Sequence, residues 1–230
     1  MPNWCDNTIY ITGPSDERNR LVAEHTVVAE NNEWQDGTRL DLTLSVPMPE
    51  ALGEVSGITS TNSPDPHPNW ANLLANGEIT QEWHDQLCED RRKEYEATQR
   101  LLAEYGYSGW WHWRLDNWGT KWAPEFFVQA HTETLTEIRG DSAWSPPDAL
   151  IASVSELFPS LTFSVVYAEE GMGFAGMLRY RNGENVVEHH DGAMHDTMPE
   201  IDWDSDDAFE MFDDWKGDYM DKFHNLARLA

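Results

Sequence analysis

The chain combines an extreme acidic charge with an unusually large number of bulky aromatic side chains. It carries 42 Asp and Glu residues against 15 Lys and Arg, a formal net charge of −27, together with 12 tryptophans in 230 residues. Acid-rich chains that stay disordered are usually poor in aromatic residues, so this combination predicts a folded protein with an anionic surface. Such a surface repels bare nucleic acid and anionic membranes, and it attracts cations and basic proteins.

The remaining composition favours a soluble, intracellular protein without a cofactor. Cys5 and Cys88 have neither metal-ligand nor redox spacing, which favours two reduced thiols in a cytosol. The first residues show no signal peptide, and no stretch approaches the ~20 apolar residues of a membrane span. The basic residues are 11 Arg and only 4 Lys. A salt-tolerant or GC-rich genome would produce this bias without any functional reason, and that alternative stays open.

Patterns in the first half predict a strand, a helix and a strand before an insertion. Residues 7–12 are β-branched and aromatic, and Ser15 is positioned to cap a following helix. Alternating leucines over 40–46 predict a second strand. Residues 50–76 are rich in Gly, Ser, Pro and Asn and are typical of a loop. Residues 78–105 have apolar residues near helical spacing, which predicts one long helix or two short ones.

The second half repeats this order. Residues 125–135 predict a strand, and Ser145 followed by two prolines predicts the start of a helix. Residues 161–169 and 174–180 predict two further strands, and Asn182-Gly183 is a favoured hairpin turn that leads into another strand.

This order of elements is typical of an α+β protein. We expect a ferredoxin-like antiparallel sheet with helices on one face, a helical insertion and a C-terminal acidic amphipathic helix. The ferredoxin-like domain would cover residues 1–195, with the insertion at about 50–105. Residues 196–230 would form an acidic C-terminal extension.

Five sequence blocks resemble the Api92-like proteins of phages and plasmids. They occur in order along residues 1 to about 190, which makes the resemblance specific. The blocks are Met1-Pro2-Asn3-Trp4-Cys5-Asp6-Asn7, Val46-Pro47-Met48-Pro49, Asn117-Trp118-Gly119-Thr120-Lys121-Trp122, Ala143-Trp144-Ser145-Pro146-Pro147 and Gly171-Met172-Gly173-Phe174-Ala175-Gly176. The resemblance implies a ferredoxin-like domain and an origin in a mobile element, and it implies no activity.

A tryptophan-rich segment is the first candidate site. Five tryptophans fall within residues 110–122, and Trp111, Trp113, Trp118 and Trp122 are candidates to line a ligand pocket. The alternative is structural, with the indoles fixing a rigid loop that caps the sheet and Lys121 over one ring.

A histidine-rich segment is the only cluster with metal-ligand chemistry. His190, Asp191 and His195 would share an ion only if the turn at Gly192 folded back. His189 and His190, as neighbours on a strand, point to opposite faces. The sequence therefore predicts a solvated loop here, with these three residues as weak metal candidates.

The C-terminal segment is the strongest functional candidate. Residues 191–221 hold 12 of the 42 acids and one base, Lys216. From Asp206 to Phe223, aromatic residues recur every three or four positions and acids fall between them, which predicts an amphipathic helix capped by Ser205. The candidate partner-binding acids are Asp204, Asp206, Asp207, Glu210, Asp213 and Asp214. A packed helix with an incidentally acidic outer face is the structural alternative.

The leading functional hypothesis is a non-enzymatic phage or mobile-element protein in the host cytoplasm. It would bind a basic host protein surface, with inhibition of a nucleic-acid-binding defence protein by nucleic-acid mimicry as the most economical version. The first alternative is a small-ligand binder or an enzyme with a tryptophan-lined pocket. The second is a structural protein of the virion. We expect no catalytic residues, no direct nucleic-acid contact and no membrane contact.

Overall fold

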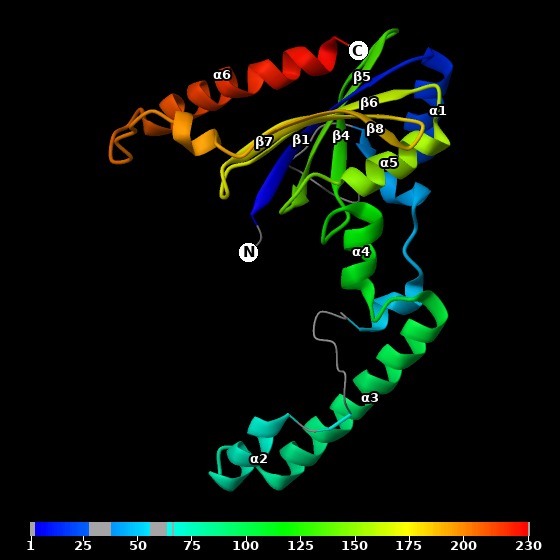
Figure 1. The fold of residues 1–230 in the computed structure, drawn as a ribbon, viewed down its shortest axis with the longest axis vertical. Helices are drawn as coiled ribbons and strands as arrows, with labels where there is room; N and C mark the ends of the chain where they lie inside the picture. The colour runs from blue at the N-terminus through cyan, green and yellow to red at the C-terminus, as the bar shows by residue number, and fades with distance from the viewer. Residues whose placement is uncertain (1–2, 28–37, 56–63, 66, 230) are drawn as a thin grey trace. The chain divides into compact units, whose positions relative to one another are not determined.

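The computed structural model describes residues 3–27, 38–55, 64–65 and 67–229. The chain divides into two compact units (Figure 1). One consists of Met1–Pro47 together with Asn117–Ala230, and the other is Met48–Asp116.

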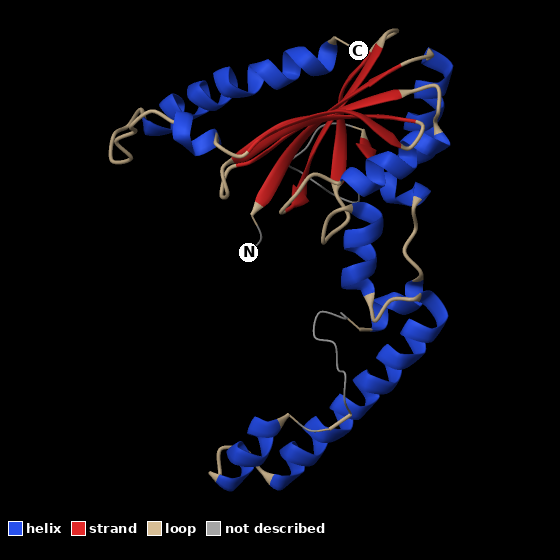
Figure 2. Ribbon diagram, viewed as in Figure 1, coloured by secondary structure: helices blue, strands red, loops and turns tan. Residues whose placement is uncertain are grey.

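The first unit is built on one eight-stranded antiparallel sheet (Figure 2). Its strand order is β2-β3-β4-β5-β1-β6-β7-β8. The strands are β1 Trp4–Thr12, β2 Thr26–Val27, β3 Arg39–Leu40, β4 Glu125–His131, β5 Leu135–Ala143, β6 Thr162–Glu169, β7 Phe174–Arg181 and β8 Glu184–Asp191.

The centre of the sheet has the ferredoxin-like arrangement. Strand β1 lies between β5 and β6, and it leads into α1, Ser15–His25. The β4–β5 hairpin is followed by α5, Asp148–Leu157, and then by β6. This is a split β-α-β unit with antiparallel neighbours, so the expected α+β class and ferredoxin-like sheet are confirmed.

Helices α1 and α5 share one face of the sheet. Buried Arg18 of α1 donates to the Thr136 hydroxyl on β5, and the Arg20 guanidinium lies 4.1 Å from the ring centroid of Phe158, just after α5. The C-terminal helix α6, Ala208–Arg228, covers the opposite face (Figure 1). The expectation of helices on one face therefore holds for α1 and α5, and α6 makes the second layer.

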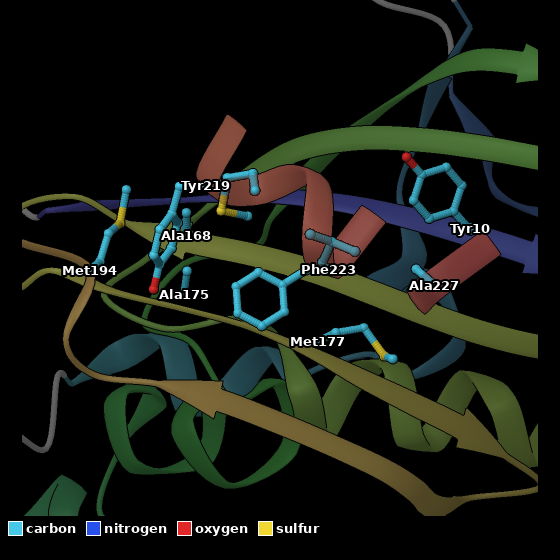
Figure 3. Close-up of a cluster of buried hydrophobic side chains, with 10 residues drawn as sticks. Tyr10, Ala168, Ala175, Met177, Met194, Tyr219, Phe223 and Ala227 are labelled. Atoms are coloured by element: carbon cyan, nitrogen blue, oxygen red, sulfur yellow. The ribbon is translucent and has the colours of Figure 1, made fainter. Parts of the chain in front are cut away.

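The apolar side of α6 packs into a buried cluster on the sheet (Figure 3). Side chains that alternate along β1, β6 and β7 point toward the helix because successive residues of a strand face opposite sides. The cluster comprises Tyr10, Val166, Ala168, Ala175, Met177, Met194, Tyr219, Met220, Phe223 and Ala227. Its members come from both ends of the sequence, so the cluster ties the C-terminus to the first strand.

The second unit is helical among its described residues. It contains α2, Pro68–Ala75, α3, Gln81–Tyr105, and most of α4, Trp110–Trp118. The Thr80 hydroxyl accepts from the Trp83 amide at the start of α3, and left-handed Gly106 ends that helix. Of the predicted helical region 78–105, residues Gln81–Tyr105 form one long helix.

The predicted strand at 40–46 is wrong beyond its first residue. Only Arg39–Leu40 pairs as β3, and Leu42–Ser45 forms a short 3-10 helix, η1. The Asp41 carboxylate accepts from the Thr43 amide and starts this turn, while Leu40 and Leu42 are both buried. Leu44 is 52% exposed, so the leucines that alternate in sequence do not share one buried face.

The predicted strand at 125–135 is two strands. The chain turns at Thr132, whose hydroxyl accepts from the Leu135 amide, and β5 then runs to Ala143. Strand β5 was not predicted, because its polar residues do not resemble those of a central strand. The hairpin at Asn182-Gly183 is confirmed, with φ of 47° and 81° at these residues.

Other local predictions also need correction. Pro68 begins α2 inside the expected loop, and residues 110–118 are helix α4 where a rigid loop was expected. The expected serine caps are displaced: the N-cap residues are Pro14, Pro147 and Asp207 for α1, α5 and α6.

We predict that Phe223→Ala lowers the free energy of unfolding by about 3 kcal/mol or more, because it opens a cavity under α6. The control is Phe209→Ala on the same helix. That side chain is 75% exposed, so its removal should change stability by no more than about 0.5 kcal/mol. Urea unfolding of both variants measures the difference, and equal losses would contradict the packing of α6.

Candidate protein-binding surface

Helix α6 is held on the sheet by polar contacts at several points. Lys216 forms ion pairs with Asp6 on β1 and with Glu170, and Lys222 lies 2.9 Å from the Asp191 carboxylate. The Trp215 indole donates to the Thr197 carbonyl over 3.0 Å. These contacts fix the rotation of the helix as well as its position.

The six predicted acids lie at the N-terminal end of this anchored segment. Asp204, Asp206 and Asp207 lie in the turn and cap before α6, and Glu210, Asp213 and Asp214 follow on its first turns. We call these six residues the acidic face. At about 100° per residue, Glu210 and Asp214 point away from the buried Tyr219 and Phe223, whereas Asp213 lies about 80° from Phe223, at the side of the helix.

The acidic face is exposed and uncompensated. All six residues are exposed to solvent. None of them takes part in an ion pair in the part of the chain that the structure describes. Their mutual repulsion is therefore screened only by solvent ions, which a cationic partner would displace.

The negative charge along the first part of α6 is less dense than that along duplex DNA. From Ala208 to Asp221 the helix carries five acids over about 20 Å, at about 1.5 Å per residue. That is one charge per about 4 Å, against about 1.7 Å for the duplex. Charge alone would therefore give this helix a weaker hold on a basic groove than DNA has.

A hollow of about 450 Å³ lies beside the acidic face, between α6 and strands β1 and β5. Asp6, Asp141 and Asp213 line it together with Lys216, Arg139 and His224. Asp6 and Asp141 are directly opposite on neighbouring strands, and Glu125 continues the row on β4. The sequence analysis missed this carboxylate row because it depends on the register of β5.

The charges along this row are unequally compensated. Glu125 pairs with Arg39 over 2.7 Å, and Asp6 pairs with Lys216 over 2.6 Å. Asp141 is left to share a hydrogen bond with Asp6. Partial desolvation, with the charge of Asp6 and this hydrogen bond, raises the pKa of Asp141 above that of an ordinary aspartate.

The histidine-rich segment gives its side chains separate partners. His190 Nδ1 lies 3.0 Å from the Tyr167 hydroxyl, Asp191 binds Lys222, and His195 Nε2 lies 2.6 Å from the Glu170 carbonyl. Across the described ranges, no group of three or more His, Cys, Asp or Glu side chains is arranged to hold a metal ion. The contact with Lys222 lowers the pKa of Asp191 to about 2 and makes this residue a structural anchor for α6.

The four candidate tryptophans fall into two different units. Trp111 and Trp113 lie on α4 in the 48–116 unit, and Trp113 is buried. In the other unit, the Trp118 indole donates to the Val46 carbonyl over 2.9 Å, and Trp122 lies against Trp4 at 5.9 Å between ring centroids. The ammonium of Lys121 lies 4.8 Å from the Trp122 ring centroid. These contacts favour a structural role for Trp118 and Trp122 over a ligand pocket.

Comparison with known proteins identifies the class of the sheet unit. Residues 117–213 match the family model described as the ferredoxin-like domain in Api92-like protein. This match confirms the resemblance over less than half of the chain, in the segment that contributes β4 to β8 and the start of α6. None of the described helices is both long and apolar enough to cross a membrane.

A search of solved structures matches a protein api92 from Yersinia pseudotuberculosis. It shares 13% sequence identity, covers 84% of this chain and 99% of its own, and gives a TM-score of 0.41. That likeness is too loose to transfer a site or an activity. No curated protein matches the sequence.

We predict that Asp141→Asn raises the free energy of unfolding at pH 7 by about 0.5 kcal/mol, because it removes a like charge opposite Asp6. The raised pKa means that ionising Asp141 costs more in the folded than in the unfolded state. This cost is absent below the ordinary pKa of aspartate, grows as the pH rises from that value, and is complete above the raised pKa of the folded state. The stability gained by Asp141→Asn should therefore vanish near pH 3.

The matched control is Glu137→Gln, which removes the same charge but breaks an ion pair of 2.8 Å with Arg139. Its stability should stay equal or fall slightly. If both variants gain equally at pH 7, the effect belongs to the net charge of −27 and not to the carboxylate row.

Proposed function

We propose that this chain is a non-enzymatic protein that binds a basic surface of another protein through the acidic face. The observation that carries the proposal is the exposure of six uncompensated acids on a segment whose opposite side is anchored to the sheet. An anchored array presents its charges without the ordering cost that a flexible acidic tail would incur on binding. Its electric field would also speed encounter with a cationic partner.

The partner that best fits this surface is a nucleic-acid-binding protein of a host cell. A surface rich in Lys and Arg that is shaped for phosphates would accept carboxylates in their place. We place the chain in a phage or plasmid because its five sequence blocks resemble the Api92-like proteins of such elements, a setting in which inhibition of a host defence protein would be useful. The proposal therefore places the protein in the host cytoplasm as an inhibitor that competes with nucleic acid.

We predict that neutralising the acidic face abolishes capture of this partner. The test variant changes the six acids to Asn or Gln, and capture from a host lysate is quantified by mass spectrometry. A control variant neutralises six exposed acids of the 48–116 unit that form no ion pair among the described residues: Glu50, Glu78, Glu82, Asp90, Glu104 and Asp116. Both variants gain the same net charge, so only the position of the charge differs.

The expected partner is a nucleic-acid-binding protein that the control variant still retains. Duplex DNA added to the lysate should release it, and complex formation should weaken steeply as salt is raised. Undiminished capture by the neutralised variant, or capture indifferent to both DNA and salt, would refute the acidic face as the binding surface.

A further inference from the structure

The apolar side of α6 continues past the part of the helix that the sheet covers. The large side chains of α6 that are buried are Tyr219, Met220 and Phe223, in its second half. Figure 1 shows the N-terminal end of α6 and the loop before it lying past the β6–β7 turn. There Phe209 is 75% exposed, Trp203 is 54% exposed and Met211 is 45% exposed. We call Trp203 and Phe209 the aromatic end.

The aromatic end is held in place by a continuous row of rings. The Trp203 ring lies 6.2 Å from Phe209 and 5.8 Å from Phe212 between centroids. The row continues through Trp215 and Tyr219 to buried Phe223, with steps of 5.6 to 6.1 Å. Because one end of the row is fixed in the core, the exposed end is ordered before any partner arrives, and binding would lose little side-chain entropy.

The charges around the aromatic end decide what can cover it. Asp204, Asp206 and Asp207 lie between Trp203 and Phe209 in the sequence, and Glu210 separates Phe209 from Met211. These acids repel anionic lipid, nucleic acid and a second copy of this chain, whose net charge is also −27. They attract a polypeptide segment that carries Lys or Arg beside an apolar side chain.

We propose that the aromatic end is an anchor site for a large apolar side chain flanked by basic residues on the partner protein. This inference rests on the proposed function. It adds an apolar contact, which is needed because the charge density of α6 is lower than that of DNA. The acids would guide the partner and set its rate of encounter, whereas Trp203 and Phe209 would hold the anchor and slow dissociation.

Two synthetic peptides test the anchor directly. Both are basic and helix-forming, one has two leucines a helical turn apart, and the other has serines in their place. We expect the full chain to bind the leucine peptide at least about tenfold more tightly, a difference of about 1.4 kcal/mol. Calorimetry should also give the more negative heat-capacity change for the leucine peptide, since apolar surface is buried.

Substitutions in the chain separate the anchor from the charges. Phe209→Ser and Trp203→Ser should each reduce the preference for the leucine peptide, and the double variant should abolish it. Trp83→Ser in the other unit is the matched control, since Trp83 is 55% exposed against 54% for Trp203. All of these side chains are largely exposed, so thermal unfolding should change little and binding losses can be assigned to the surface.

The outcomes are distinct for the anchor and for the proposed function. A leucine preference that survives in the double variant overturns the anchor site, as does tighter binding of anionic phospholipid vesicles or duplex DNA than of the leucine peptide. Neutralising the acidic face should instead weaken both peptides by a similar factor. If it weakens neither, the electrostatic part of the proposed function fails while the leucine preference still reports on the anchor.

Discussion

The burial of one side of α6 against β6 and β7 is the interaction on which the surface described above depends. Ordering the backbone of each residue costs about 1–2 kcal/mol, and an isolated acidic helix could not recover that cost. Tyr219 and Phe223 offset part of that cost by burial in the cluster that includes Ala168 and Met177 of the sheet. The same packing turns Glu210 and Asp214 outward, so the position of these charges follows from the apolar contacts.

The basic residues near α6 serve this packing and leave the outer acids uncompensated. Lys216 and Lys222, two of only four lysines in the chain, pair with Asp6, Glu170 and Asp191 on the sheet side. The Arg179 guanidinium donates to the Leu226 carbonyl near the end of α6. These basic side chains therefore hold the helix on the sheet, and the acidic face keeps its negative charge on the side open to a partner.

Sequence patterns predicted the elements that depend on neighbouring residues. They failed for features that depend on contacts between residues far apart in the sequence. The aromatic and acidic period of 206–223 gave α6, and Asn182-Gly183 gave its hairpin, because each depends on neighbouring residues. Strand β5 was missed since its polar residues, such as Asp141, are tolerated only through pairing with β1. The exposure of Phe209 was equally hidden, because it depends on where the sheet ends under α6.

Hydrogen exchange across α6 tests most directly whether the acidic array is fixed to the sheet. The amides of residues 215–228 should exchange nearly as slowly as those of β6 and β7, because opening the helix requires breaking the same cluster. The first turn, under the exposed Phe209, should exchange faster. If residues 215–228 exchanged as fast as an unstructured peptide while β6 stayed protected, the acids would belong to a loose tail and the account would be wrong.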